Sequence, residues 1–206
     1  PCVILYSIGN EIPETGNRLD VQWGKKIADK IRCLDDTRFV TNSMNLMLSV
    51  MNDFPKLMAG QSAEEKKGGE INEMMTDLGA LMAGIVTSDF VTEKTKEASG
   101  QVDVTGLNYA AQRYEMDHRL RPNRILVGSE TYPMDLDVNW ALVEKYPNII
   151  GDFDWTAYDY LGEAGIGKIS YNAQKQMSFY APYPCRAAYC GDLNLLGDAR
   201  PVAFWR

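Results

Sequence analysis

The feature that most constrains the fold is a repeated alternation of short apolar runs with longer stretches of helical spacing. The apolar runs show little polar alternation, which is typical of strands buried on both faces of a parallel sheet. This order of elements predicts βα units and therefore an α/β fold. The predicted strands cover residues 3–8, 39–41, 102–107, 125–128 and 149–153.

Helical spacing fills the intervals between these strands. In residues 20–32 and 71–85, apolar side chains recur every three or four positions, which places them on one helix face. Three shorter helices are expected at residues 92–98, 110–119 and 138–146, and another begins within residues 200–206. The charged segment 61–69 ends in two glycines and reads as an exposed loop.

Five strands are too few to close a barrel of eight. Two interpretations fit the pattern: a small open sheet, or the C-terminal part of a (β/α)8 TIM barrel, about strands 4–8. The chain opens almost at once on an apolar strand, which favours a segment of a longer polypeptide. We therefore expect residues 1–206 to form one catalytic barrel domain that is truncated at its N-terminal side.

Charge and composition exclude several classes of partner. The chain has 206 residues, with 21 basic and 28 acidic side chains and a net charge of −7, and it has no basic run. Nucleic acids and anionic membranes bind clustered Lys and Arg, so neither is expected as a partner. No stretch approaches the roughly 20 apolar residues that span a bilayer.

The potential metal ligands are few and badly spaced. The four cysteines (Cys2, Cys33, Cys185 and Cys190) match no zinc pattern, and His118 is the only histidine. We expect buried or half-buried free thiols, and a surface position on a helix for His118. No metal and no cofactor are predicted.

Two glutamates follow predicted strands. Glu11 ends the run that begins at residue 3, and Glu130 follows the strand 125–128. In α/β barrels the reactive side chains project from the C-terminal ends of strands. Two carboxylates facing each other are what glycoside hydrolysis requires. An ordinary acid after a strand is the alternative interpretation for each of them.

Four motifs, at residues 7–11, 106–109, 125–132 and 151–167, resemble strand motifs of the retaining barrel glycosidases, and their order along the chain resembles that of glycoside hydrolase family 2. Ser-Ile-Gly-Asn-Glu at 7–11 resembles the fourth strand, with its Asn-Glu pair. Gly-Leu-Asn-Tyr at 106–109 resembles the sixth strand, and residues 125–132 resemble the seventh. The long motif at 151–167 is similar to the eighth strand and following loop of bacterial family 2 β-galactosidases.

The resemblance implies roles for two acids and a tyrosine. Glu11 would be the general acid and then the general base, and Glu130 would be the nucleophile. The hydroxyl group of Tyr109 would donate a hydrogen bond to Glu130. The implied activity is hydrolysis of terminal β-D-galactosides with retention of configuration, by double displacement.

Other residues would bind the carbohydrate substrate. Asn10 would bind the sugar 2-hydroxyl, Trp155 would stack under the pyranose ring, and Asn108 is also assigned to substrate binding. Asp159 and Glu163 remain open between hydroxyl binding and a structural role.

Two rival functions remain beside this one. Glucuronides or mannosides would use the same two glutamates, and the chain could also be a non-catalytic fragment. The sugar-binding residues of the first three barrel strands are absent from this chain, so we expect poor activity from these 206 residues alone. Open sheet edges predict homo-oligomers that share strands. The sequence does not decide between bacterial cytoplasm and periplasm.

Overall fold

The computed structural model describes residues 2–53, 81–162, 166–167 and 185–206. The chain divides into two compact units. The first contains residues 1–131 and 138–153, and the second contains residues 132–137 and 154–206. The assignment of all 206 residues to one catalytic domain stays a prediction.

The first unit is built on one five-stranded sheet whose strands follow the order of the sequence. Neighbouring pairs from β1 to β4 are parallel. The parallel sheet and the α/β class are as the sequence predicts, whereas membership of a barrel stays a prediction. The strands are β1 (Leu5–Asn10), β2 (Phe39–Asn45), β3 (Val104–Asn108), β4 (Ile125–Thr131) and β5 (Ile149–Asp154).

Burial differs between the middle and the edges of this sheet. All five residues of β3 are buried, as expected for a strand covered on both faces. The same expectation is wrong for the edge strands, because Ile150 of β5 is 53% exposed and β1 has no fully buried residue. The apolar run before β1 is exposed as well, and Ile4 reaches 65%. Edge strands have a neighbour on one side only, which explains the difference.

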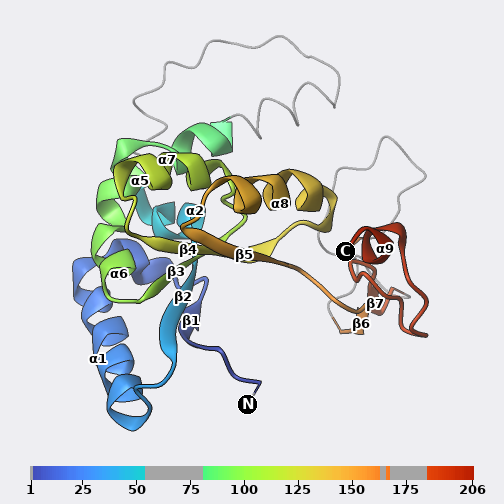
Figure 1. The fold of residues 1–206 in the computed structure, drawn as a ribbon, viewed down its shortest axis with the longest axis horizontal. Coiled ribbons are helices and arrows are strands. Elements are labelled where there is room, and N and C mark those ends of the chain that lie inside the picture. The colour runs from blue at the N-terminus through green and yellow to red at the C-terminus, as the bar shows by residue number, and fades with distance from the viewer. Residues whose placement is uncertain (1, 54–80, 163–165, 168–184) are drawn as a thin grey trace. The chain divides into compact units, whose positions relative to one another are not determined.

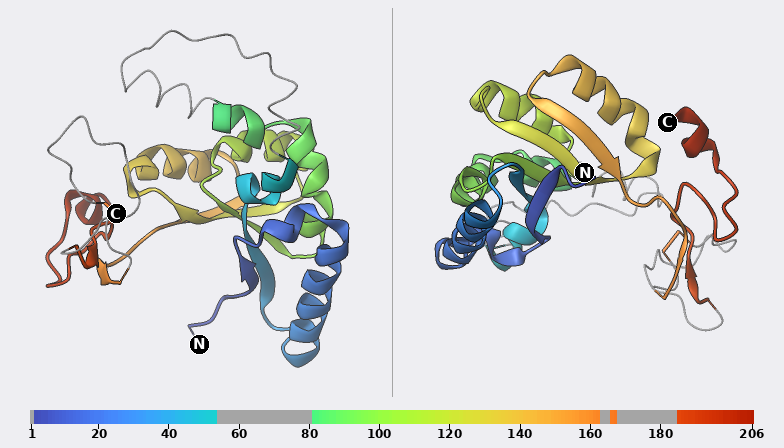
Figure 2. Two further views of the ribbon diagram at one scale, coloured as in Figure 1. Left: turned by 180° about the vertical axis from the view of Figure 1, so that it is seen from behind. Right: turned by 60° about the horizontal axis from the view of Figure 1, so that its bottom comes forward.

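Helices connect the strands as βα units. In Figure 1, α7 and α8 lie above β4 and β5, and Figure 2 shows from behind that α1 runs beside β1 and β2. The expected helix at 92–98 is two short helices, α5 and α6, which meet at Thr95. The longer helices are α1 (Arg18–Leu34), α5 (Asp89–Lys94), α6 (Lys96–Gly100), α7 (Gln112–Leu120) and α8 (Leu136–Lys145).

Short elements follow the C-terminal ends of the first two strands. The 3₁₀ helix η1 (Pro13–Gly16) follows β1, and α2 (Leu46–Ser49) and η2 (Met51–Asp53) follow β2. The predicted loop 61–69 and most of the predicted helix 71–85 lie outside the described residues, although residues 81–86 are helical.

The core of the first unit joins the sheet to these helices. Val91 and Leu126 are completely buried, and Tyr114 brings its ring into the same cluster. Burial of such side chains contributes on the order of 1.5–3 kcal/mol each to folding. The remaining buried members are Val21, Met44, Leu46, Val50, Ile85, Val86, Ala98, Leu107, Ala110, Tyr146 and Ile149.

The second unit is small and has little regular structure among its described residues. Its strands β6 (Tyr160–Leu161) and β7 (Ala187–Ala188) are antiparallel. The unit also contains η3 (Pro133–Asp135) and ends in α9 (Pro201–Trp205), the helix expected at residues 200–206. No helix in the described parts of the chain is long and apolar enough to cross a membrane.

Candidate active site

Both strands that carry the candidate catalytic acids change register just before those acids. Between Ser7 and Asn10, β1 has one residue more than its partner β2. Between Gly128 and Glu130, β4 has one residue more than β3, and that residue is Ser129. Bulges of this kind re-aim side chains and are frequent beside active sites. Here they turn the ends of β1 and β4 just where Glu11 and Glu130 occur.

Two residues at these strand ends have left-handed backbone. Glu11 has φ of +51° and Tyr109 has φ of +54°. A side chain in this region costs on the order of 1–3 kcal/mol, and such residues cluster at functional sites. Backbone hydrogen bonds hold both residues in place. The Glu11 amide donates to the backbone carbonyl oxygen of Ser43, and the Tyr109 amide donates to the backbone carbonyl oxygen of Glu130.

The side chain of Asn108 lies between the two acids. Its Nδ2 is 3.2 Å from Glu11 Oε1, 3.2 Å from Glu130 Oε2 and 3.0 Å from Asn10 Oδ1. Its Oδ1 accepts a hydrogen bond of 2.7 Å from the hydroxyl group of Ser129. Asn108 is 1% exposed. Its amide hydrogen-bonds to protein groups in this structure, and its predicted role in substrate binding stays a prediction.

The geometry brings the two glutamates together. Because one nitrogen lies 3.2 Å from an oxygen of each, those two oxygens are at most 6.4 Å apart, twice 3.2 Å. The other oxygen of Glu130 accepts a short hydrogen bond from the Tyr109 hydroxyl group, the contact that the sequence resemblance implied. Glu11, Glu130 and Tyr109 are all half-buried, so the acids lie near the surface of the unit.

Asn45 and Ser129 belong to the same cluster but were not identified from the sequence. Asn45 Nδ2 donates to Glu11 Oε1 over 2.9 Å. Asn45 is also the N-cap of α2, a position that its place before Leu-Met-Leu could have revealed. Ser129 carried no signal of its own, because its role depends on the register between β3 and β4.

A second layer supports β4 from beneath. Asp152 on β5 accepts hydrogen bonds from the hydroxyl groups of Tyr114 and Thr131. Burial, and then the nearby Asp152 carboxylate, raise the pKa of Tyr114, so it stays a neutral donor. A Cβ on Gly128 would come within 2.2 Å of the Tyr114 hydroxyl oxygen. Only glycine fits there, and this contact fixes β4 two residues before Glu130.

The remaining predicted site residues fall in different surroundings. Asn10 is exposed at the end of β1 and touches Asn108, so it is available to a ligand. Trp155 belongs to the second unit, where its ring makes an edge contact with Tyr160 at 6.0 Å. Its substrate-stacking role stays a prediction.

The contacts of Asp159 favour a structural role over the binding of sugar hydroxyl groups. Both of its oxygens accept hydrogen bonds of 2.7 Å from Arg200, and one also accepts from the Gly191 amide at 2.9 Å. Its side chain is only 2% exposed. The hydrogen bonds from Arg200 lower the pKa of this carboxyl group. Glu163 lies outside the described residues.

His118 lies on the helix α7 as expected and is half-buried, with its Nδ1 2.6 Å from Asn148 Oδ1 and its ring packed on Tyr146. The expectation of buried or half-buried thiols is wrong for two of the four cysteines, because Cys2 and Cys33 are exposed; none of the four forms a disulfide. Within the described parts of the chain, no three His, Cys, Asp or Glu side chains gather as a metal site.

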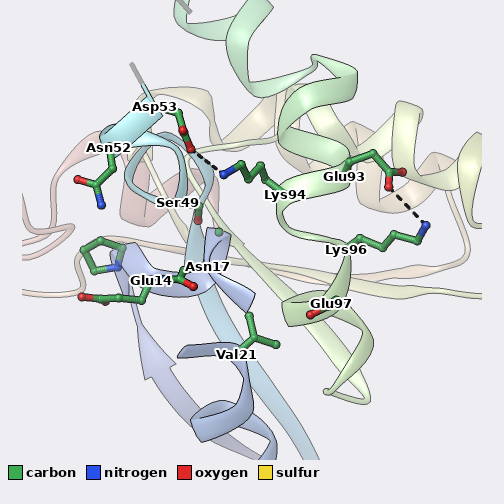
Figure 3. A pocket seen from close by; sticks show the side chains of 12 residues that line it. Glu14, Asn17, Val21, Ser49, Asn52, Asp53, Glu93, Lys94, Lys96 and Glu97 are labelled. Atoms are coloured by element: carbon green, nitrogen blue, oxygen red, sulfur yellow. Dashed lines mark hydrogen bonds and ion pairs between the residues drawn. The ribbon is translucent and has the colours of Figure 1, made fainter. Parts of the chain in front are cut away.

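A separate hollow of about 770 Å³ lies on the first unit. It is lined by η1, α1, η2, α5 and α6, and neither glutamate of the acid pair lines it. Figure 3 shows the ion pair of Lys94 with Asp53, at 2.8 Å, and that of Lys96 with Glu93. Two of the four acids that line this hollow are therefore paired with lysines, and the other two are Glu14 and Glu97.

Comparison with known proteins gives the chain a context. No protein-family model matches it, and no curated protein matches it. A solved structure of a glycosyl hydrolase family 2 member from Bacteroides cellulosilyticus is 31% identical, with a TM-score of 0.67. That match covers 99% of this chain and 20% of the other. The chain is similar over its length to part of a family 2 protein.

Two further structures extend this comparison. A family 2 member from Bacteroides cellulosilyticus DSM 14838 is 27% identical, with a TM-score of 0.62, over 100% of this chain and 19% of its own. The β-D-glucuronidase of Dictyoglomus thermophilum is 14% identical, with a TM-score of 0.53, over 100% of this chain and 31% of its own. The last match shows likeness of fold alone. This chain spans about a fifth of the length of the family 2 structures.

Proposed function

We propose that this chain carries the catalytic carboxylates of a retaining glycoside hydrolase of family 2 that cleaves terminal β-D-galactosides. The observation that carries the proposal is the single Asn108 amide nitrogen within 3.2 Å of both Glu11 and Glu130. The two oxygens nearest that nitrogen are at most 6.4 Å apart, which supports a pair of acids that can act on one glycosidic bond, and retention is the mechanism that the family resemblance implies.

The first step forms a covalent intermediate. A Glu130 oxygen attacks the anomeric carbon while the bond to the leaving oxygen breaks, and Glu11 gives its proton to that oxygen. The Tyr109 hydroxyl group holds Glu130 Oε1 in position for this attack. In the second step Glu11 takes a proton from water, which attacks the same carbon and releases Glu130.

The galactoside assignment depends on the likeness of residues 151–167 to bacterial β-galactosidases. Glucuronides and mannosides remain the alternatives, because their hydrolysis would use the same two glutamates. A glucuronide carries a carboxylate, which Lys or Arg would recognise.

A fluorinated sugar would test the proposal. The chain, and a longer polypeptide that contains it, are incubated with 2-deoxy-2-fluoro-β-galactosyl fluoride, and the adduct is mapped by peptide mass. We expect one adduct per chain on the peptide with Glu130. Labelling by the corresponding glucuronyl fluoride alone would overturn the sugar assignment. No adduct from either reagent on the longer polypeptide would overturn the nucleophile assignment.

The proposal includes self-association through the open edge of β1. Val3 and Ile4 are 45% and 65% exposed beside that edge. An exposed apolar strand edge is a template for pairing with another copy. Light scattering after size exclusion should show dimers of the 206-residue chain, and the charge in Ile4→Lys should shift them toward monomer. A wild-type chain that is monomeric at high concentration would contradict this part.

A further inference from the structure

The two oxygens of Glu11 have different surroundings. Oε1 accepts from Asn45 Nδ2 at 2.9 Å and lies 3.2 Å from Asn108 Nδ2. Among the described residues, none donates a hydrogen bond to Oε2. An oxygen that already faces two N–H donors is a poor place for a proton, because the proton would point at another hydrogen.

The direction of the Asn45 amide is fixed by the backbone. Its Oδ1 accepts from the Met47 amide at 3.1 Å and from the Leu48 amide at 3.4 Å, as the N-cap of α2. Backbone N–H groups can only donate, so the atom that faces them must be the oxygen. The NH₂ group therefore faces Glu11 and can only donate to it.

Asn108 Nδ2 faces oxygen acceptors. It lies within 3.2 Å of Asn10 Oδ1 and of one oxygen of each glutamate, and the Asn108 Oδ1 lies 2.7 Å from the Ser129 hydroxyl group. Because backbone N–H groups orient the Asn45 amide, its direction does not depend on the protonation of Glu11. The amide nitrogens of Asn45 and Asn108 thus both face Glu11 Oε1.

We propose that Asn45 is a positioning residue for Glu11, and that its donation to Oε1 holds the transferable proton on Oε2. This inference rests on the proposed acid/base role of Glu11. Asn45 is half-buried and acts through the Glu11 carboxylate. Its removal lets the carboxyl group rotate and lets the proton occupy either oxygen. Proton transfer to the leaving group then becomes less efficient, whereas attack by Glu130 continues.

Leaving-group dependence separates this role from a structural one. Asn45→Ser and Asn45→Asp both keep a good N-cap for α2, but the serine is too short to reach Glu11 and the aspartate has no NH₂ group to donate. Each variant is made in the longer polypeptide that contains this chain. The ratio kcat/KM, which reports the first step, is measured on phenyl and on 2,4-dinitrophenyl β-D-galactoside. Dinitrophenolate leaves with little need of a proton.

We expect kcat/KM on the phenyl galactoside to fall roughly 10- to 100-fold in both variants, within the range that general acid catalysis supplies. On the dinitrophenyl galactoside we expect less than about 3-fold loss, since little acid catalysis is needed there. The control is Ser88→Ala, which removes the N-cap of α5. It should lower both activities equally or not at all.

The other outcomes are decisive as well. Equal losses on both substrates, or no loss on the phenyl galactoside, would overturn the positioning role. A loss in Asn45→Asp without a loss in Asn45→Ser would trace the effect to the new charge and would overturn it too. A wild-type protein that cleaves neither galactoside would overturn the proposed function and this inference together.

Discussion

The acids of the two units are compensated in opposite ways. In the first unit, Glu11 and Glu130 receive hydrogen bonds from neutral groups, namely two asparagine amides and one tyrosine hydroxyl. In the second unit, Asp159 is paired with Arg200, and Arg206 contacts two further aspartates, Asp154 and Asp192. In the first unit, neutral hydrogen-bond donors orient the carboxylates, whereas in the second unit arginines neutralise them.

Exposure follows the same division. The three aspartates of the second unit have side chains that are 2–6% exposed, whereas both glutamates of the first unit are half-buried. A buried carboxylate needs a cation, because desolvation of an unpaired charge costs several kcal/mol. An acid that must give or take a proton needs access and an unneutralised charge. The contrast supports the proposed catalytic role of the first acid cluster and a structural role for the second.

The largest expected effect is on activity in the first unit. Glu130→Gln keeps the shape and the hydrogen bonding of the side chain but removes the nucleophile. We expect kcat/KM on an aryl galactoside to fall about 10⁴-fold or more, with a change in the free energy of unfolding below about 1 kcal/mol. Glu144→Gln on the exposed face of α8 is the control. If Glu130→Gln retained more than a few per cent of the activity, Glu130 would not be the nucleophile and the contrast between the two acid clusters would fail.

A smaller effect, on stability, is expected in the second unit. Asp159→Asn removes the negative charge that pairs with Arg200. It also breaks one of the two hydrogen bonds between Arg200 and residue 159. The free energy of unfolding should fall by about 2–3 kcal/mol in a urea titration, because a buried partner is lost. Asp198→Asn, at an exposed position in the same unit, should change it by less than about 0.5 kcal/mol. An unchanged free energy of unfolding in Asp159→Asn would mean that the Asp159–Arg200 pair does not stabilise the unit.

The smallest effect is a pH dependence that sharpens the assignment of Asp159. The hydrogen bonds from Arg200 lower the pKa of this carboxyl group from its ordinary value of 3.8. Its stabilisation is therefore complete above about pH 3.8 and is lost as the pH falls through the lowered pKa. Urea titrations at pH 5 and pH 3 should show a smaller difference between wild type and Asp159→Asn at pH 3.

A pH-independent difference between wild type and Asp159→Asn would indicate that Arg200 does not perturb Asp159.

Local patterns in the sequence were enough for much of the fold. Apolar runs with flanking turns gave five strands within a few residues, because such runs reflect burial of a single strand. These apolar runs did not predict where the strands end. The prediction stopped β2 at residue 41, whereas the strand continues through polar residues to Asn45. That error hid Asn45, which is the fourth strand residue after residue 41 and the N-cap of α2.

By itself, the sequence determined the order of strands and helices and the placement of Glu11 and Glu130 at strand ends. It also placed the Tyr109 hydroxyl group on Glu130, through the family resemblance. Only the tertiary structure decided the register shifts in β1 and β4 and the fixed direction of the Asn45 and Asn108 amides. These depend on which residues of separate strands lie opposite one another, and no local spacing encodes that pairing.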